Sequence, residues 1–185
     1  PHILSFRALV VTVVASYAVY AAPPELLTLQ QQYEKSLDAQ VVSVYAIALG
    51  QLNVRYLEAV ERGITTARAA GNLAEVLALE EEKKLITGGG PVPDGDDTQT
   101  QPSLKKLRTV YREQQLKLNT QKAANHAVVV KPHLAALKQL EVTLTKANRV
   151  ADAKEVMDYR TTLEGNAASS SPSIFPQASF TNSLG

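Results

Sequence analysis

An internal repeat constrains the fold of this chain more than any other feature of its sequence. The segment Pro24–Tyr33 resembles Pro102–Tyr111, which lies 78 residues further on, and later apolar positions recur at an offset of 77, so one residue is missing from the second copy. A repeated unit with an apolar stripe buries that stripe against its neighbours, so the repeat predicts packing and not a reaction centre. The pairs at an offset of 77 are Leu57 and Leu134, Val60 and Leu137, Leu73 and Val150, Ala74 and Ala151, and Leu79 and Val156.

The spacing of apolar residues predicts that the first copy begins with a long helix. From Leu26 onward they recur about every 3.7 residues, which is a helical period closer to an 11-residue repeat than to a heptad. Pro24 suits the first helical turn, where its missing N–H has no cost. We therefore expect a nearly straight helix from Pro24 to about Ala70.

A turn and a second, shorter helix are predicted next. Gly71 can adopt the left-handed conformation that ends a helix, and Asn72 can cap the following helix, with Glu75 returning the hydrogen bond. The second helix should run from about Leu73 to Ile86. In the second copy Asn148 replaces Gly71, and asparagine tolerates the same conformation.

The fold class that follows is all-α: two tandem helical hairpins, each a long helix plus a short one, in an elongated, coiled-coil-like bundle. The expected units are hairpin 1 (23–86), a flexible Gly/Pro/Asp linker (87–101), hairpin 2 (102–164) and a disordered Ser/Pro linker (165–185). Pro132 predicts a kink or break in the second long helix, and the missing residue should lie near it.

Charge and uncovered surface both predict contact between the two copies. Residues 22–86 hold 6 basic and 9 acidic groups, whereas 102–164 hold 12 basic and 6 acidic groups, so opposite charges should orient the hairpins. Each short helix covers about a third of its long partner, so Leu26–Ala48 must bury its stripe elsewhere. The other long helix or a second chain could cover it, which leaves a homodimer possible.

The first 22 residues have the pattern of an export signal. Arg7 supplies the positive charge, Ala8–Val19 the apolar stretch, and Val19-Tyr20-Ala21 the small-residue cleavage site. The expected location is therefore periplasmic or extracellular, with membrane attachment only if the signal stays uncleaved. The chain has no cysteine, which excludes disulfides, thiolate metal sites and cysteine nucleophiles.

A run of cations is the one candidate binding site for a polymer. One stretch of the second long helix holds six basic residues and a single acidic residue, Glu113, and an anionic polysaccharide could bind there. A solvated helix face docked near the acidic first copy explains the run equally well. A nearly neutral exported protein is not expected to bind nucleic acid. The candidate residues are Lys105, Lys106, Arg108 and Arg112, with Lys117 and Lys122 further along.

No catalytic, cofactor or metal site is predicted. His126 and His133 are two helical turns apart without a carboxylate between them, and the chain lacks a Gly-x-Ser-x-Gly turn and a phosphate-binding loop. Asp94 begins a calcium-loop-like stretch, but Gln99 and Lys105 stand where glycine and glutamate are required. The tyrosines on the helical stripe are expected in the core or an interface, a sugar-stacking platform being the alternative: Tyr33, Tyr45, Tyr56 and Tyr111.

The closing residues carry a resemblance to a known family. Ser179-Phe180-Thr181-Asn182-Ser183-Leu184-Gly185 resembles the lead-in to domains of the formylglycine-generating sulfatase-modifying enzyme family. The Tyr33–Leu37 and Ala70–Leu73 signatures also resemble N-terminal regions of such proteins. The resemblance implies that the family's domain follows Gly185, and its catalytic cysteines have no counterpart here.

Together, these features predict that the residues form a non-catalytic, exported helical spacer or interaction module. Its partner would be its own C-terminal domain of the sulfatase-modifying type. The alternative is a freestanding periplasmic adaptor whose helices bind a protein or an anionic polymer.

Overall fold

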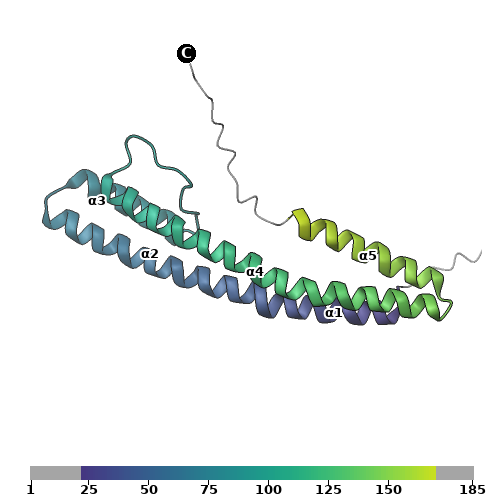
Figure 1. Cartoon of the computed structure of the whole chain (residues 1–185). Coiled ribbons are helices and arrows are strands. Elements are labelled where there is room, and N and C mark those ends of the chain that lie inside the picture. The colour runs from purple at the N-terminus through teal and green to yellow at the C-terminus, as the bar shows by residue number, and fades with distance from the viewer. Residues whose placement is uncertain (1–21, 170–185) are drawn as a thin grey trace, which may run out of the picture.

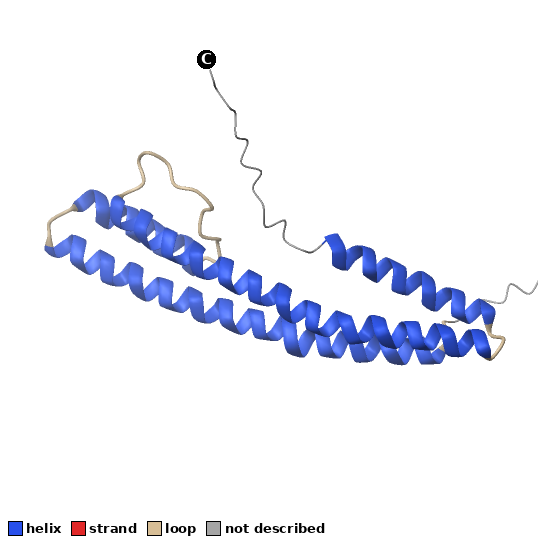
Figure 2. Cartoon of the chain, viewed as in Figure 1, coloured by secondary structure: helices blue, strands red, loops and turns tan. Residues whose placement is uncertain are grey.

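The computed structural model describes residues 22–169, which form an all-α structure without strands in that range (Figures 1 and 2). The predicted signal peptide, apart from Ala22, and the tail from residue 170 lie outside the described residues. The helices are α1 (Pro24–Leu37), the π-helical turn η1 (Asp38–Val42), α2 (Ser43–Ala69), α3 (Leu73–Thr87), α4 (Pro102–Lys146) and α5 (Val150–Ser169).

Two long helical runs lie side by side along a rod (Figure 1). The first is α1, η1 and α2 in direct succession, and the second is α4, whose 45 residues span about 68 Å at 1.5 Å per residue. α3 packs on α2 at one end of the rod, and α5 packs on α4 at the other. We call these the α3 end and the α5 end.

Each end has its own apolar core, and each core draws on both halves of the chain. The core of the α3 end joins α2 and α3 to the N-terminal part of α4, and that of the α5 end joins α4 and α5 to α1. The repeat partners Val60 and Leu137 are fully buried, one in each core. The division of the chain into two hairpins is therefore not confirmed as a division of its core. The buried anchors of the α5 end are Leu26, Leu137, Leu144, Ala153 and Val156.

The two predicted turns have the same backbone hydrogen bonds. The N–H of Gly71 donates to Arg68 and that of Asn72 to Ala67; 77 residues later Asn148 donates to Thr145 and Arg149 to Leu144. This pairing is the Schellman motif, which needs a left-handed residue, and φ is +69° at Gly71 and +59° at Asn148. Asparagine thus takes the role of glycine as predicted.

The predicted cap of α3 is also present. The Asn72 side chain accepts a hydrogen bond of 3.2 Å from the backbone N–H of Glu75. The return bond differs from the expected one, because the Glu75 carboxylate accepts from the Asn72 side-chain amide at 2.9 Å. The Asn72 backbone N–H is already used by the turn.

The predicted break at Pro132 is wrong, because α4 continues through it. Proline removes one helical hydrogen bond, to the carbonyl of Val128, and costs about 3 kcal/mol in a helix interior. Both Pro132 and Val128 are exposed, so water can bind that carbonyl. Val129, Val130 and His133 are buried around this point, and their packing offsets the cost.

The one-residue difference between the copies lies in the first long helix, at η1, and not near Pro132. Tyr33, before η1, matches Tyr111 at an offset of 78, whereas Val60, after it, matches Leu137 at 77. Within η1 the Ser43 N–H donates to the Asp38 carbonyl five residues back. A π-helical turn absorbs a single inserted residue in this way.

Two predicted boundaries change. α5 continues through Gly165 to Ser169, so the second short helix is five residues longer than predicted. The connection 88–101 has neither helix nor strand, but several of its residues contact α4. Val92 is buried in the core of the α3 end, and Asp96 forms ion pairs with Arg108 and Arg112.

Candidate functional site

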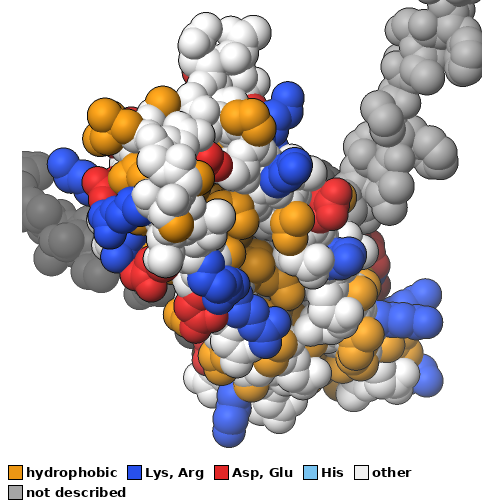
Figure 3. All heavy atoms as spheres, turned by 90° about the vertical axis from the view of Figure 1, so that its left-hand side faces the viewer, with side chains coloured by type: hydrophobic (Ala, Val, Ile, Leu, Met, Phe, Trp, Pro, Cys, Tyr) orange, Lys and Arg blue, Asp and Glu red, His pale blue; other side chains and the backbone are white. Residues whose placement is uncertain are grey.

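The predicted cation run is divided by the fold. Arg108 and Arg112 point toward the acidic residues of the α3 end, with side chains only 14% and 24% exposed. Lys105 and Lys106 remain exposed. Basic and acidic side chains are intermixed on the surface of this end, without a continuous basic face (Figure 3). Two of the four predicted polyanion-binding residues, Arg108 and Arg112, are therefore already paired with carboxylates of this end.

Glu82 of α3 is the centre of a buried polar network. Its carboxylate accepts hydrogen bonds from the Tyr56 hydroxyl at 2.7 Å and from the Arg108 guanidinium at 2.6 Å. Arg108 also contacts Asp96 at 3.4 Å, and Arg112 binds the other Asp96 oxygen at 2.6 Å. The network joins α2, α3, the 88–101 connection and α4.

Burial and charge pairing change the acidity of these groups. Burial raises the pKa of Tyr56, and the neighbouring Glu82 carboxylate raises it further, so the hydroxyl remains a hydrogen-bond donor. The hydrogen bond from Arg112 lowers the pKa of Asp96, and the bond to Glu82 raises the pKa of Arg108. Asp96 and Arg108 are thus charged at neutral pH.

At the α5 end, an aromatic cluster occupies the positions equivalent to this network. His133 of α4 stacks on Tyr33 of α1, with ring centroids 4.4 Å apart and planes at 13°. The Tyr159 ring of α5 meets His133 edge-on at 6.0 Å. His133 and Tyr159 stand 77 residues after Tyr56 and Glu82, so equivalent positions hold a charged network at one end and rings at the other.

His133 is buried and its Nε2 atom has no hydrogen-bond partner. Burial lowers the pKa of this imidazole, because the charged form loses its hydration. His126 is half-exposed and lies two turns away on α4. No group of three or more His, Cys, Asp or Glu side chains suited to a metal ion occurs within residues 22–169.

Polar contacts tie the two long helices together at the middle of the rod. Tyr45 of α2 donates a hydrogen bond of 2.7 Å to Asn119, and the Lys122 ammonium lies 4.6 Å from the centroid of its ring. The Asn125 side chain donates to the backbone carbonyl of Gln40 in η1 at 3.2 Å. α4 therefore supplies a hydrogen bond to the irregular turn.

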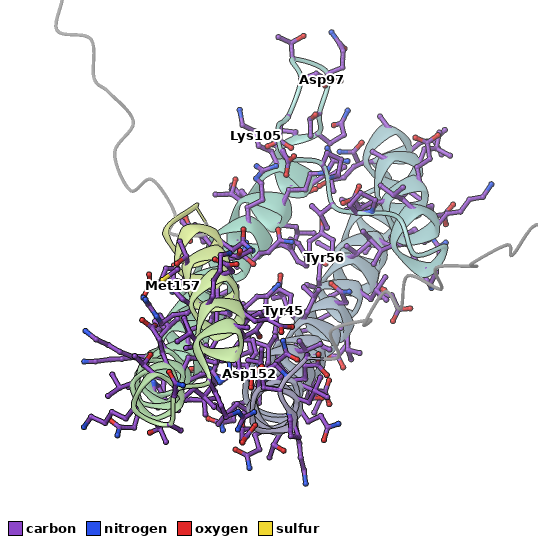
Figure 4. The ribbon with its side chains drawn as sticks, turned by 90° about the vertical axis from the view of Figure 1, so that its right-hand side faces the viewer. Tyr45, Tyr56, Asp97, Lys105, Asp152 and Met157 are labelled. Carbon is purple, nitrogen blue, oxygen red and sulfur yellow. The ribbon has the colours of Figure 1, made fainter. Side chains whose placement is uncertain are left out.

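The four predicted interface tyrosines all lie between helices. Tyr56 and Tyr111 are buried against each other, with ring centroids 4.8 Å apart, and the Tyr111 hydroxyl donates to Asn53 at 2.7 Å. Tyr33 and Tyr45 are half-buried. Figure 4 shows Tyr45 and Tyr56 between the two long helical runs, with Asp97 and Lys105 at the outer edge. Their placement gives no exposed row of rings for sugar stacking.

An apolar groove, which we call the α4 groove, lies on the middle of α4 and has a volume of about 710 Å³. Sequence reasoning missed it, because the groove depends on where α5 ends. Its apolar lining consists of Val41, Leu116, Ala123, Ala127, Val130, Leu134 and Ala167. Its polar lining consists of Asn119, Thr120, Lys122, His126 and Lys131.

A second apolar surface lies on α2, where Val44, Ile47 and Val54 are 46%, 63% and 56% exposed. Among residues 22–169, one helix, Pro24–Ala69, has the length and composition that a membrane span requires, with a mean hydropathy of 1.2 in its most apolar stretch. Only 6% of that stretch is buried inside the structure. This helix therefore presents apolar surface that the rest of residues 22–169 does not cover.

Comparison with known proteins gives no match to a family model, to a curated protein or to a solved structure.

Proposed function

We propose that this chain is a non-catalytic, exported helical module that acts as a spacer and an interaction arm. The proposal rests on where the chain enters the rod, at the start of α1, and where it leaves the rod, at the end of α5. Glu25 at the start of α1 contacts Arg149 beside the start of α5 at 2.6 Å, so both helices begin at the same end of the rod. The last described residue, Ser169, lies one α5 length away, about 30 Å along the rod.

The rest of the rod extends beyond both connections. α4 spans about 68 Å, so about 40 Å of helix pair, capped by the α3 end, projects past the end of α5. The part of the rod between the two connections, about 30 Å long, acts as the spacer. An arm with a free end, and with the exposed apolar side chains of α2 along it, suits contact with another molecule.

The proposed neighbour is a C-terminal domain of the formylglycine-generating sulfatase-modifying type, and the proposed compartment is the periplasm or the extracellular space. The resemblance of residues 179–185 supports the first, and the signal-like pattern of residues 1–22 supports the second. Sequencing the gene past Gly185 tests the neighbour: a methionine and a strand-rich domain are expected. A stop codon would instead favour the freestanding adaptor.

Sedimentation equilibrium of the chain from residue 22 tests the interaction arm. We expect concentration-dependent self-association or binding to the C-terminal domain, weakened at least tenfold by Ile47→Asp on the arm. The control is Met157→Asp on α5, whose side chain is also partly exposed but lies off the arm. An equal effect of both substitutions, or none, would contradict an interaction surface on α2.

The adaptor alternative includes binding of an anionic polymer, for which four residues of the cation run remain exposed: Lys105, Lys106, Lys117 and Lys122. Heparin retention that falls with salt and is lost in Lys105→Glu/Lys106→Glu would support it. Because Arg108 and Arg112 are already paired, we expect retention to be weak.

A further inference from the structure

The α4 groove begins where α5 ends. Ala167, in the last turn of α5, forms part of its lining, and Leu116, at its other end, is 67% exposed. Between them the floor is made by Ala123 and the buried Val130. An apolar hollow of this size on a soluble surface commonly marks a place where another segment binds.

The direction of α5 leads the chain over the groove. α5 runs antiparallel to α4, since Arg160 binds Glu141 at 3.1 Å while Ala167, seven residues later, lines the groove together with Ala127. A chain continuing from Ser169 in the same direction passes from Ala127 toward Leu116. These 11 residues of α4 correspond to about 16 Å.

The sequence after Ser169 places its first large apolar side chains at the matching distance. Ile174 and Phe175 follow five and six residues later, between Pro172 and Pro176. At about 3.3 Å per extended residue they reach about 16 to 20 Å, which is the far end of the groove at Leu116. The prolines favour an extended backbone without helix.

The α3 end already contains a comparable arrangement. After α3 the chain reads Pro91-Val92-Pro93, and Val92 is buried to 7% exposure in the core that includes α4. The carbonyl of Pro93 accepts a hydrogen bond from Arg112 of α4 at 3.0 Å. A proline-flanked apolar residue after a short helix thus covers α4 at this end.

We propose that Ile174 and Phe175 of the C-terminal segment dock in the α4 groove, as Val92 does in the core of the α3 end. Docking fixes the path of the chain as it leaves the rod, so whatever follows is held beside the middle of α4. The proposal rests on the groove and on the order of the sequence, and does not require the proposed function.

Cysteine pairs test the docking directly, because the chain has no cysteine of its own. In the full chain, Phe175→Cys with Leu116→Cys should form an intramolecular disulfide at least tenfold faster than Phe175→Cys with Lys117→Cys. Leu116 lines the groove, whereas Lys117 is exposed and about 100° further round the helix. Equal rates for the two pairs would overturn the proposal.

Fluorescence provides a second readout without a cross-link, because the chain also lacks tryptophan. Phe175→Trp should emit at shorter wavelength and resist iodide quenching, compared with Phe180→Trp, which the proposal leaves outside the groove. Adding Ala127→Arg, at an exposed position, should remove the difference. A fluorescence difference that depends on protein concentration would show that the segment docks from a second copy. Solvent exposure equal to that of Phe180→Trp would show that Phe175→Trp does not dock at all. Either result refutes the proposal.

Discussion

At the α3 end one carboxylate, that of Glu82, holds together three elements of the structure. It is buried, and its two oxygens are shared between the Tyr56 hydroxyl and the Arg108 guanidinium. A buried ion pair contributes little net stability compared with apolar packing, but removing one partner is costly because the other stays buried and uncompensated. Exposed pairs behave differently, since water replaces the lost partner.

Glu82→Gln should therefore lower the free energy of unfolding by about 3 kcal/mol, measured by urea denaturation. The matched control is Glu80→Gln on the same helix. Glu80 pairs with Arg68, and both side chains are largely exposed, so a loss below about 1 kcal/mol is expected. Similar losses for the two variants would show that the Glu82 network is not buried in solution.

The burial of His133 at the α5 end predicts that the stability of the folded state depends on pH. Its pKa in the folded state lies below the ordinary value of 6.5, because the imidazole is buried between Tyr33 and Tyr159. As the pH falls below about 6.5, the unfolded state binds a proton that the folded state resists, so stability decreases. The slope from this group is at most about 1.4 kcal/mol per pH unit.

Urea denaturation between pH 7.5 and 5 measures this effect. His133→Phe keeps a ring in the stack and should remove the contribution of His133 to the slope. His126→Gln, at a half-exposed position, should leave it in place. If the slope is unchanged by His133→Phe, the acid sensitivity arises from other groups.

At the scale of elements, the π-helical turn η1 explains why one long helix has an extra residue without a shift of its apolar stripe. A residue inserted into a regular α-helix rotates everything beyond it by about 100°. In η1 the wider turn absorbs that rotation, so Leu26 and Val60 both remain fully buried. α4 lacks such a turn, and its Leu104 and Leu137 are one residue closer in sequence.

Deletion of the exposed Ala39 should consequently be tolerated. The turn would become a plain α-helix with the same residue count as α4, and we expect full helicity by circular dichroism and a stability loss below about 1 kcal/mol. Deletion of the exposed Lys117 from α4 is the control. It has no wide turn to absorb the change, so the stripe rotates and several kcal/mol of packing are lost. Equal damage from both deletions would mean that η1 does not hold the inserted residue.

The apolar spacing indicates that the first long helix contains an extra residue, but the spacing does not give the position of that residue. The apolar step of about 3.7 exceeds the α-helical 3.6, and over 11 steps from Leu26 to Ala67 the excess amounts to about one residue. An average over the helix cannot place it. The sequence predicted an irregularity at Pro132 instead, but packing of the buried neighbours Val129 and His133 keeps α4 continuous there.

Other features were predictable in proportion to how local they are. The turns at Gly71 and Asn148 depend on a few adjacent residues, and the all-α class depends on a period that recurs throughout. The ion pairs of Arg108 and Arg112, the stack on His133 and the α4 groove join residues far apart in sequence. Single-chain patterns give no partner for such groups, so the cation run could be interpreted equally as a polymer site or as a docked face.

At the scale of the whole molecule, the two copies are interleaved. The N-terminal part of each long helix packs against the C-terminal part of the other: α1 joins α5 and the end of α4, and the start of α4 joins α3 and the end of α2. Neither copy contains a complete core. The excess acid of residues 22–86 and the excess base of 102–164 also favour contact between unlike copies, as in the Glu25–Arg149 and Glu82–Arg108 pairs.

Interleaving predicts that the halves fold together and not separately. Fragments 22–94 and 95–185, cut at the exposed Asp94–Gly95 bond, should each have low helicity or associate nonspecifically, because α1 and the start of α4 would lose their partners. Mixed in equal amounts, they should regain the circular dichroism of the intact chain and sediment as a 1:1 complex. Raising the salt concentration should weaken the complex, since unlike charges contribute to it. Two fragments that are each fully helical monomers, with a mixture equal to their sum, would instead mean that the copies are independent hairpins and that the shared cores do not form in solution.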